Sequence, residues 1–100
     1  MTYDRIVHDF DSHIRKSGCQ YYNEFYIGIT NDVDTRLFGQ HRVNKDKQWW
    51  IFSPADNEEI ARDVEKHYLE FGMKGGPGGG SGKGDSKIVY CYVITPYTVE

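Results

Sequence analysis

Four side chains in the first two thirds of this sequence have the chemistry of a phosphate site. Tyr26 lies in the aromatic and β-branched run FYIGIT, and Arg36 and His41 follow within 15 positions. The planar fork of an arginine matches two phosphate oxygens, and tyrosine and histidine can hold or transfer a proton. Glu65 belongs to a later charged segment, and a carboxylate is a ligand that hard divalent cations prefer. These residue types could serve a phosphate and metal site only if the fold brings them together.

The element that carries Arg36 follows the aromatic run directly. FYIGIT is typical of a buried strand. Asn31 or Asp32 can cap a following helix, in which Arg36 lies one step from the apolar face. The apolar residues at helical spacing are Val33, Leu37 and Phe38. The sequence therefore predicts a short helix that presents Arg36 beside the strand.

The segment SPADNEEIARDVEKHYLEFG predicts the helix that carries Glu65. Asp56 and Glu59 fit a capping box, and Gly72 is a typical stop. The expected buried stripe consists of Ile60, Ala61, Val64, Tyr68 and Phe71. At about 100° per residue, Glu65 falls about 40° beyond Ala61, at the rim of that stripe. A partly desolvated carboxylate suits a cation, and the alternative is an ion pair with Arg62 or Lys66.

The remaining segments complete an α+β domain. Residues 2–18 have the spacing of an amphipathic helix, QWWIFS is typical of a strand, and residues 88–95 form a final strand, apolar on both faces and so interior to the sheet. Asn23-Glu24 is either the tip of a tight hairpin, which would place Tyr21 opposite Tyr26, or part of a longer loop. We expect one domain over residues 1–100, a small mixed sheet with helices packed on it.

Composition narrows the function classes. The net charge of −3 and pI of about 5.8 argue against a protein that coats nucleic acid non-specifically, because that mode needs a broad basic surface. Two cysteines without metal-ligand spacing and the lack of an apolar leader or membrane-length run favour a soluble, cytoplasmic protein without membrane contact.

The Gly-rich segment 73–87 is expected to be a flexible loop. It is not a P-loop, because Lys83 is followed by Gly84 and the segment leads from a helix into a strand. A mobile linker and a lid over a neighbouring site are the two interpretations of it.

Tyr26-Ile27-Gly28, then Arg36 and His41, then Ala61-x-x-x-Glu65 resemble the second half of the GIY-YIG nuclease motif, over Phe25 to Leu69. The resemblance implies a GIY-YIG-like fold and metal-dependent hydrolysis of nucleic acid, DNA rather than RNA. It places Tyr26 at the attacking water or scissile phosphate, Arg36 on phosphate charge, and Glu65 on Mg²⁺ (or Mn²⁺). It makes His41 a proton acceptor or hydrogen-bond partner.

The first motif, Gly-Ile-Tyr, is missing from its usual place about ten residues before Tyr26, where this chain has Lys16. The nearest substitute is Cys19-Gln20-Tyr21, so Tyr21 joins the expected catalytic set if the tight hairpin forms. With a longer loop, the candidates are Tyr22, Tyr90 and Tyr92.

Two other functions remain open. The same fold without catalysis would be a module that binds a nucleic acid, a nucleotide or a protein partner, including a second copy of the chain. Alternatively, the chain is an unrelated α+β interaction domain. If Tyr26, Arg36 and Glu65 converge on one site in the fold, the enzyme is favoured over the non-catalytic module.

Overall fold

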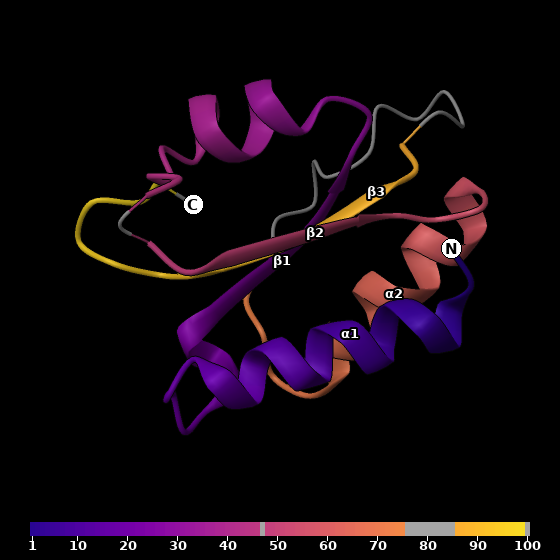
Figure 1. Cartoon of the computed structure of the whole chain (residues 1–100), viewed down its shortest axis with the longest axis horizontal. Coiled ribbons are helices and arrows are strands. Elements are labelled where there is room, and N and C mark those ends of the chain that lie inside the picture. The colour runs from indigo at the N-terminus through magenta and orange to yellow at the C-terminus, as the bar shows by residue number, and fades with distance from the viewer. Residues whose placement is uncertain (47, 76–85, 100) are drawn as a thin grey trace.

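The computed structural model describes residues 1–46, 48–75 and 86–99. Three strands, β1 (Phe25–Thr30), β2 (Trp50–Pro54) and β3 (Ile88–Val93), form a sheet in the order β1-β3-β2. Two α-helices cover one face, and the segment that follows β1 covers the other (Figure 1). The predicted α+β class is confirmed. The predicted mixed sheet is wrong, because both strand pairs are antiparallel and the parallel contact between Tyr26 and Lys74 is an isolated bridge.

Helix α1 (Tyr3–Lys16) lies within the predicted range 2–18 and is amphipathic, as its periodicity predicted. The Thr2 hydroxyl accepts a hydrogen bond from the backbone N–H of Arg5, and Ile6 and Phe10 are buried on the sheet side. Gly18 has a φ of 81°, the left-handed conformation that commonly ends a helix. The helix therefore starts and stops for local reasons and is fixed by its apolar face.

The N-cap of helix α2 (Glu58–Glu70) is Asn57, one residue later than the predicted cap Asp56. The Asn57 side chain accepts from the N–H of Ile60 at 2.9 Å, whereas Asp56 binds the N-terminal amine of Met1 at 2.7 Å. The capping box at Asp56 is therefore wrong. Buried positions of the predicted stripe are Ala61, Val64 and Tyr68. Phe71 is exposed instead, because it lies past the helix end and stacks on Tyr22 at the surface.

The predicted tight hairpin is also wrong. Tyr22–Glu24 (η1) is a single 3₁₀ turn, and the Glu24 carboxylate accepts from the N–H groups of Gln20 and Tyr21, each at 2.9 Å. This cap lies at the start of the turn, and Tyr21 is 65% exposed. The partner of β1 is β3, so the residue opposite Tyr26 is Tyr92.

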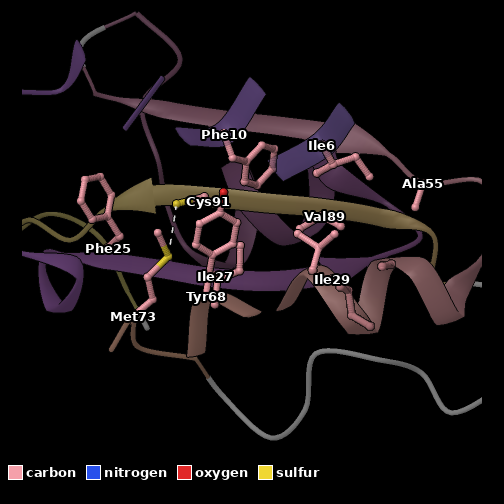
Figure 2. Close-up of a cluster of buried hydrophobic side chains, with 12 residues drawn as sticks. Ile6, Phe10, Phe25, Ile27, Ile29, Ala55, Tyr68, Met73, Val89 and Cys91 are labelled. Carbon is pink, nitrogen blue, oxygen red and sulfur yellow. Dashed lines mark hydrogen bonds between the residues drawn. The ribbon is translucent and has the colours of Figure 1, made fainter. Parts of the chain in front are cut away.

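The main core lies between the helices and the sheet (Figure 2). It contains Ile6, Phe10, Phe25, Ile27, Ile29, Ala55, Ala61, Val64, Tyr68, Met73, Val89 and Cys91. Strand β3 is the central strand, as its two apolar faces predicted. Val89 and Cys91 belong to this core, whereas Tyr90 and Tyr92 point to the opposite face. Each large buried apolar side chain contributes about 1.5–3 kcal/mol, so this layer fixes the sheet.

The chain that leaves α2 protects the outer edge of β1. The N–H of Ile27 donates to the carbonyl of Lys74, and the N–H of Lys74 donates to the carbonyl of Phe25, both at 2.9 Å. These bonds satisfy backbone groups that an open edge would expose. Residues 76–85, most of the expected flexible loop and lid, lie outside the described residues.

In the part of the chain that the structure describes, no helix has both the length and the apolar character to span a bilayer.

The Asn57 cap makes a first prediction. Asn57→Ala should lower the free energy of unfolding by about 1 kcal/mol, because the N–H of Ile60 loses its acceptor, and Asn57→Ser should restore most of it. Urea denaturation measures both. Equal stability of Asn57→Ala and the wild type would show that the cap does not hold the start of α2.

Candidate functional site

The segment that carries Arg36 is π-helical, not α-helical as predicted. In η2 (Asp34–Gln40), the N–H of His41 donates to the carbonyl of Arg36, five residues earlier, at 3.0 Å. Asp32 starts the segment by accepting from the N–H of Thr35 at 3.2 Å and from its hydroxyl at 2.9 Å. Those bonds to Thr35 lower the pKa of Asp32. The wide turn packs Leu37 on the sheet and turns Arg36 toward β3.

Three tyrosines line the sheet beneath η2. Tyr26 of β1 stacks on Tyr92 with ring centroids 5.3 Å apart, and on Tyr90 at 6.4 Å. Gly28 pairs with Tyr90 across the strands, and a Cβ at Gly28 would lie 2.4 Å from the Tyr90 hydroxyl oxygen. The glycine of Tyr-Ile-Gly therefore makes the room in which the Tyr90 ring crosses β1.

The Tyr90 hydroxyl joins Arg36 to His41. It accepts from Nε of Arg36 at 3.2 Å, and it lies 2.8 Å from Nε2 of His41. Nδ1 of His41 lies 2.6 Å from the carbonyl of Val99, and a carbonyl can only accept. In the neutral ring, Nδ1 therefore carries the hydrogen, and Nε2 accepts from Tyr90. The result is a directed chain of hydrogen bonds from Arg36 to Val99.

The charges of this network follow from its burial. Burial raises the pKa of Tyr90 to about 12, although the hydrogen bond and positive charge of Arg36 oppose the shift. The hydrogen bond to Tyr90 raises the pKa of Arg36, to which a hydrogen bond with Tyr26 also contributes. At neutral pH, Tyr90 is therefore protonated and Arg36 is charged.

Glu65 lies at the rim of the buried stripe of α2, as its helical position predicted, and is half-buried. Burial raises the pKa of its carboxyl, and the charge of Arg62 opposes this shift. Arg62 forms its ion pair with Glu58 at 3.5 Å. Within the described residues, Glu65 has no hydrogen bond or ion pair. Its charge is one of the causes that raise the pKa of Tyr90, so the carboxylate lies within electrostatic reach of the tyrosine cluster.

The donor set limits the metal that this site could hold. Among the described residues, no three His, Cys, Asp or Glu side chains gather at one point. Glu65 would therefore be the single protein ligand. Mg²⁺ retains several waters and can be held by a single carboxylate. The half-buried Glu65 carboxylate forms no ion pair with a described residue, so a metal ion would compensate its charge. The chemistry of Glu65 thus fits Mg²⁺ or Mn²⁺.

Exposure divides the site into two layers. Tyr26, Tyr90 and His41 are 4%, 0% and 3% exposed, whereas Arg36 and Glu65 both reach solvent in part. In this arrangement a ligand would touch Arg36 and Glu65, and the buried groups would position Arg36. The His41 side chain is thus closed to a ligand that enters from solvent.

The sequence-predicted residues come together incompletely. Tyr26, Arg36 and His41 meet around Tyr90, and the charge of Glu65 contributes to the raised pKa of Tyr90, whereas Tyr21 lies elsewhere on the surface. Tyr90 was one of three alternatives to Tyr21, and the sequence favoured none of them. The Val99 carbonyl was missed entirely, because a backbone acceptor leaves no signal in residue type.

No family model, no curated protein and no solved structure matches this chain. The functional conclusion therefore depends on geometry and on the motif residues.

The contact between Gly28 and Tyr90 yields a second prediction. Gly28→Ala should cost about 1–3 kcal/mol, because the new methyl group overlaps the buried Tyr90 ring. Gly39→Ala is the matched control, since the nearest atom to its Cβ is the Asp34 carbonyl oxygen at 3.5 Å; its effect should stay within about 0.5 kcal/mol. Chemical denaturation measures both, and equal losses would contradict the packing of Tyr90 over Gly28.

The third prediction concerns the pH dependence that Glu65 imposes. Because folding raises its pKa above the ordinary value of 4.5, the stability that the protonated form contributes is present below that value. It is lost as the pH rises through the raised pKa, where the ionised group opposes folding. Glu65→Gln should therefore melt at a higher temperature than the wild type at pH 8, and the gap should close as the pH falls below 4.

The control for this comparison is Glu59→Gln, which alters an exposed carboxylate on the same helix. It should not raise the melting temperature at pH 8. A Glu65→Gln protein that melts with the wild type at every pH, without added metal, would show that the Glu65 carboxylate is well solvated.

Proposed function

We propose that this chain is a metal-dependent phosphodiesterase of the GIY-YIG type that hydrolyses nucleic acid. One observation carries the proposal: Tyr26 and Arg36, from the Tyr-Ile-Gly strand and the segment after it, meet a second tyrosine within electrostatic reach of Glu65. Buried polar groups at such a density are costly unless they are fully paired, and functional sites are where they gather.

In this proposal Tyr90 takes the place that the first motif gives to its tyrosine. The resemblance implies two tyrosines on one sheet face, on the Tyr-Ile-Gly strand and on its neighbour. Here the neighbour is β3, whose Ile88-Val89-Tyr90 lies antiparallel to Gly28-Ile29-Thr30. The final strand of the chain therefore supplies the residue that the sequence lacks before Tyr26, which supports a GIY-YIG-like fold with its strands in a different chain order.

The described residues divide the work between them. Nε of Arg36 donates to Tyr90, and Nη1 donates to the Gln40 amide oxygen at 2.9 Å. Arg36 would bind the non-bridging phosphate oxygens with its remaining N–H groups, which neutralises charge as it develops. Glu65 would hold the cation, which when bound supplies Lewis-acid stabilisation and an activated water. Tyr90 and His41 would keep Arg36 in place, because His41 fixes the direction of the Tyr90 hydroxyl.

The second candidate is a non-catalytic module on the same fold, which binds a nucleic acid, a nucleotide or a protein partner. The observation that favours it is the closure of the tyrosine cluster, because Tyr26 and Tyr90 are at most 4% exposed. A module of this kind would use Arg36 as an anchor for an anionic group and would need no water at the tyrosines.

A cleavage assay separates the two candidates and gives the fourth prediction. Mg²⁺ or Mn²⁺ is titrated against single-stranded, branched and duplex DNA and RNA. Glu65→Gln and Arg36→Lys should each lower the rate by at least about 100-fold, because each removes charge stabilisation or its fork geometry from the transition state. DNA should be cut in preference to RNA.

The matched control is Glu59→Gln, which alters an exposed charge on α2 and should leave the rate unchanged. Melting temperatures of all variants establish that they are folded. Cleavage that survives Glu65→Gln would contradict the metal assignment, and binding without any cleavage in either metal would favour the module.

A further inference from the structure

A second surface feature lies next to the network, where the chain after His41 meets the C-terminal segment. The N–H of Val99 donates to the carbonyl of His41 at 2.8 Å, and the Gln48 amide donates to the Thr95 hydroxyl at 3.2 Å. In Figure 1 these segments run side by side at the end of the sheet marked C. Between them lies a groove of about 610 Å³, lined by Arg42, Asn44, Gln48, Thr95, Pro96 and Tyr97.

Tyr97 is presented at the rim of this groove on a rigid turn. The N–H of Thr95 donates to the Thr98 hydroxyl at 2.9 Å, and that hydroxyl donates back to the Thr95 carbonyl at 3.0 Å. The N–H of Tyr97 donates to the Thr95 hydroxyl at 3.2 Å. These bonds fix the backbone on both sides of a ring that is 80% exposed. An aromatic side chain held in this way binds a flat partner at a lower entropic cost.

The opposite wall carries Arg42. It has a φ of 58°, which is uncommon for a residue with a side chain and costs of the order of 1 kcal/mol. Among the described residues that line the groove there is no carboxylate, so none of them opposes the Arg42 charge. The cleft beside α1 and α2 differs in this respect, because Asp63 and Glu70 line it and would repel a phosphate.

Polar groups in the wall are used to build the groove. The Gln48 amide oxygen accepts from the N–H of Asn44 at 2.8 Å, and its nitrogen is bound to Thr95. The Gln48 amide therefore stabilises the groove wall, and these bonds occupy the groups that would otherwise hydrogen-bond to the edge of a base. A ligand would therefore be recognised through stacking and charge, the combination by which proteins bind single strands without sequence preference.

We infer that this groove is a single-strand subsite, in which a nucleobase stacks on Tyr97 and a neighbouring phosphate pairs with Arg42. The inference rests on the proposed function and names its substrate class. A single strand offers base faces to an exposed ring, whereas a duplex hides them, and a groove of this volume lies in the range of about 300–1,000 Å³ that small ligands occupy. Because Arg42 follows His41 directly, the subsite would extend the strand away from Arg36.

The test is fluorescence anisotropy with 5′-fluorescein-labelled dT₈, U₈ and a 16-base-pair duplex, in EDTA so that no cleavage occurs. Tyr97→Ala should weaken binding of dT₈ or U₈ about 5- to 100-fold, the range expected for losing one stacked base. Tyr97→Phe should bind as the wild type does. Preference for dT₈ or U₈ separates a DNA strand from an RNA strand, which differ in the sugar and in the base methyl group, and either preference supports the subsite.

Two further variants sharpen the experiment. Tyr21→Ala removes another exposed aromatic ring, one that does not line the groove, and should leave binding unchanged. Arg42→Gly removes the charge and also relieves the positive φ, so it should weaken binding without loss of stability and reduce the salt slope by about 0.7.

The subsite is overturned if the wild type binds neither single strand, if the duplex binds more tightly, or if Tyr97→Ala binds like the wild type. It is also overturned if Tyr21→Ala loses as much affinity as Tyr97→Ala. The proposed hydrolysis fails separately, since Tyr97-dependent binding without metal-dependent cleavage leaves the subsite intact. If cleavage depends on Glu65 but binding does not depend on Tyr97, the proposed hydrolysis stands and the subsite fails.

Discussion

The polar network on the η2 face of the sheet depends on the hydrogen bonds of the Tyr90 hydroxyl. This hydroxyl ties Arg36 of η2 to His41, and through His41 to the carbonyl of Val99, so the network joins η2, β3 and the C-terminal segment. A buried network of this kind is stable only when every member is paired. That condition is met, since the described buried side chains include no polar atom without a partner. The glycine at position 28 and the wide turn of η2 are both consequences of placing that oxygen there.

The two faces of the sheet divide stability and chemistry between them. The helix side is an apolar core that would fix the sheet whatever the other face carried. The η2 side has fewer apolar residues and a polar network, and its shape is set by hydrogen bonds. Glu65 belongs to the helix layer, but its charge contributes to the raised pKa of Tyr90 on the other face. The proposed site would therefore use residues of both layers. The groove at Tyr97 adjoins the same network through Val99 and His41.

Sequence patterns predicted the parts of the fold that local physics controls. Both α-helices follow apolar periodicity, and the central place of β3 follows from its two apolar faces. The hairpin failed because Asn23-Glu24 forms a capped 3₁₀ turn, while the real partner of β1 comes from the far end of the chain. Tyr26, Arg36 and His41 were selected as candidates through the motif, and Glu65 through the motif and its helical angle. Tyr90 could not be singled out, because the sequence of neither strand predicts the register in which two strands distant along the chain pair.

The central claim is that Glu65 and Arg36 share one cation and phosphate site. Paramagnetic Mn²⁺ tests it most directly, because it broadens the NMR signals of nuclei near its site. We predict broadening of the Glu65 backbone amide and the Arg36 Nε–H, with both effects lost in Glu65→Gln and retained in Glu59→Gln. Broadening centred instead on Asp63 and Glu70, or broadening that persists in Glu65→Gln, would contradict the account.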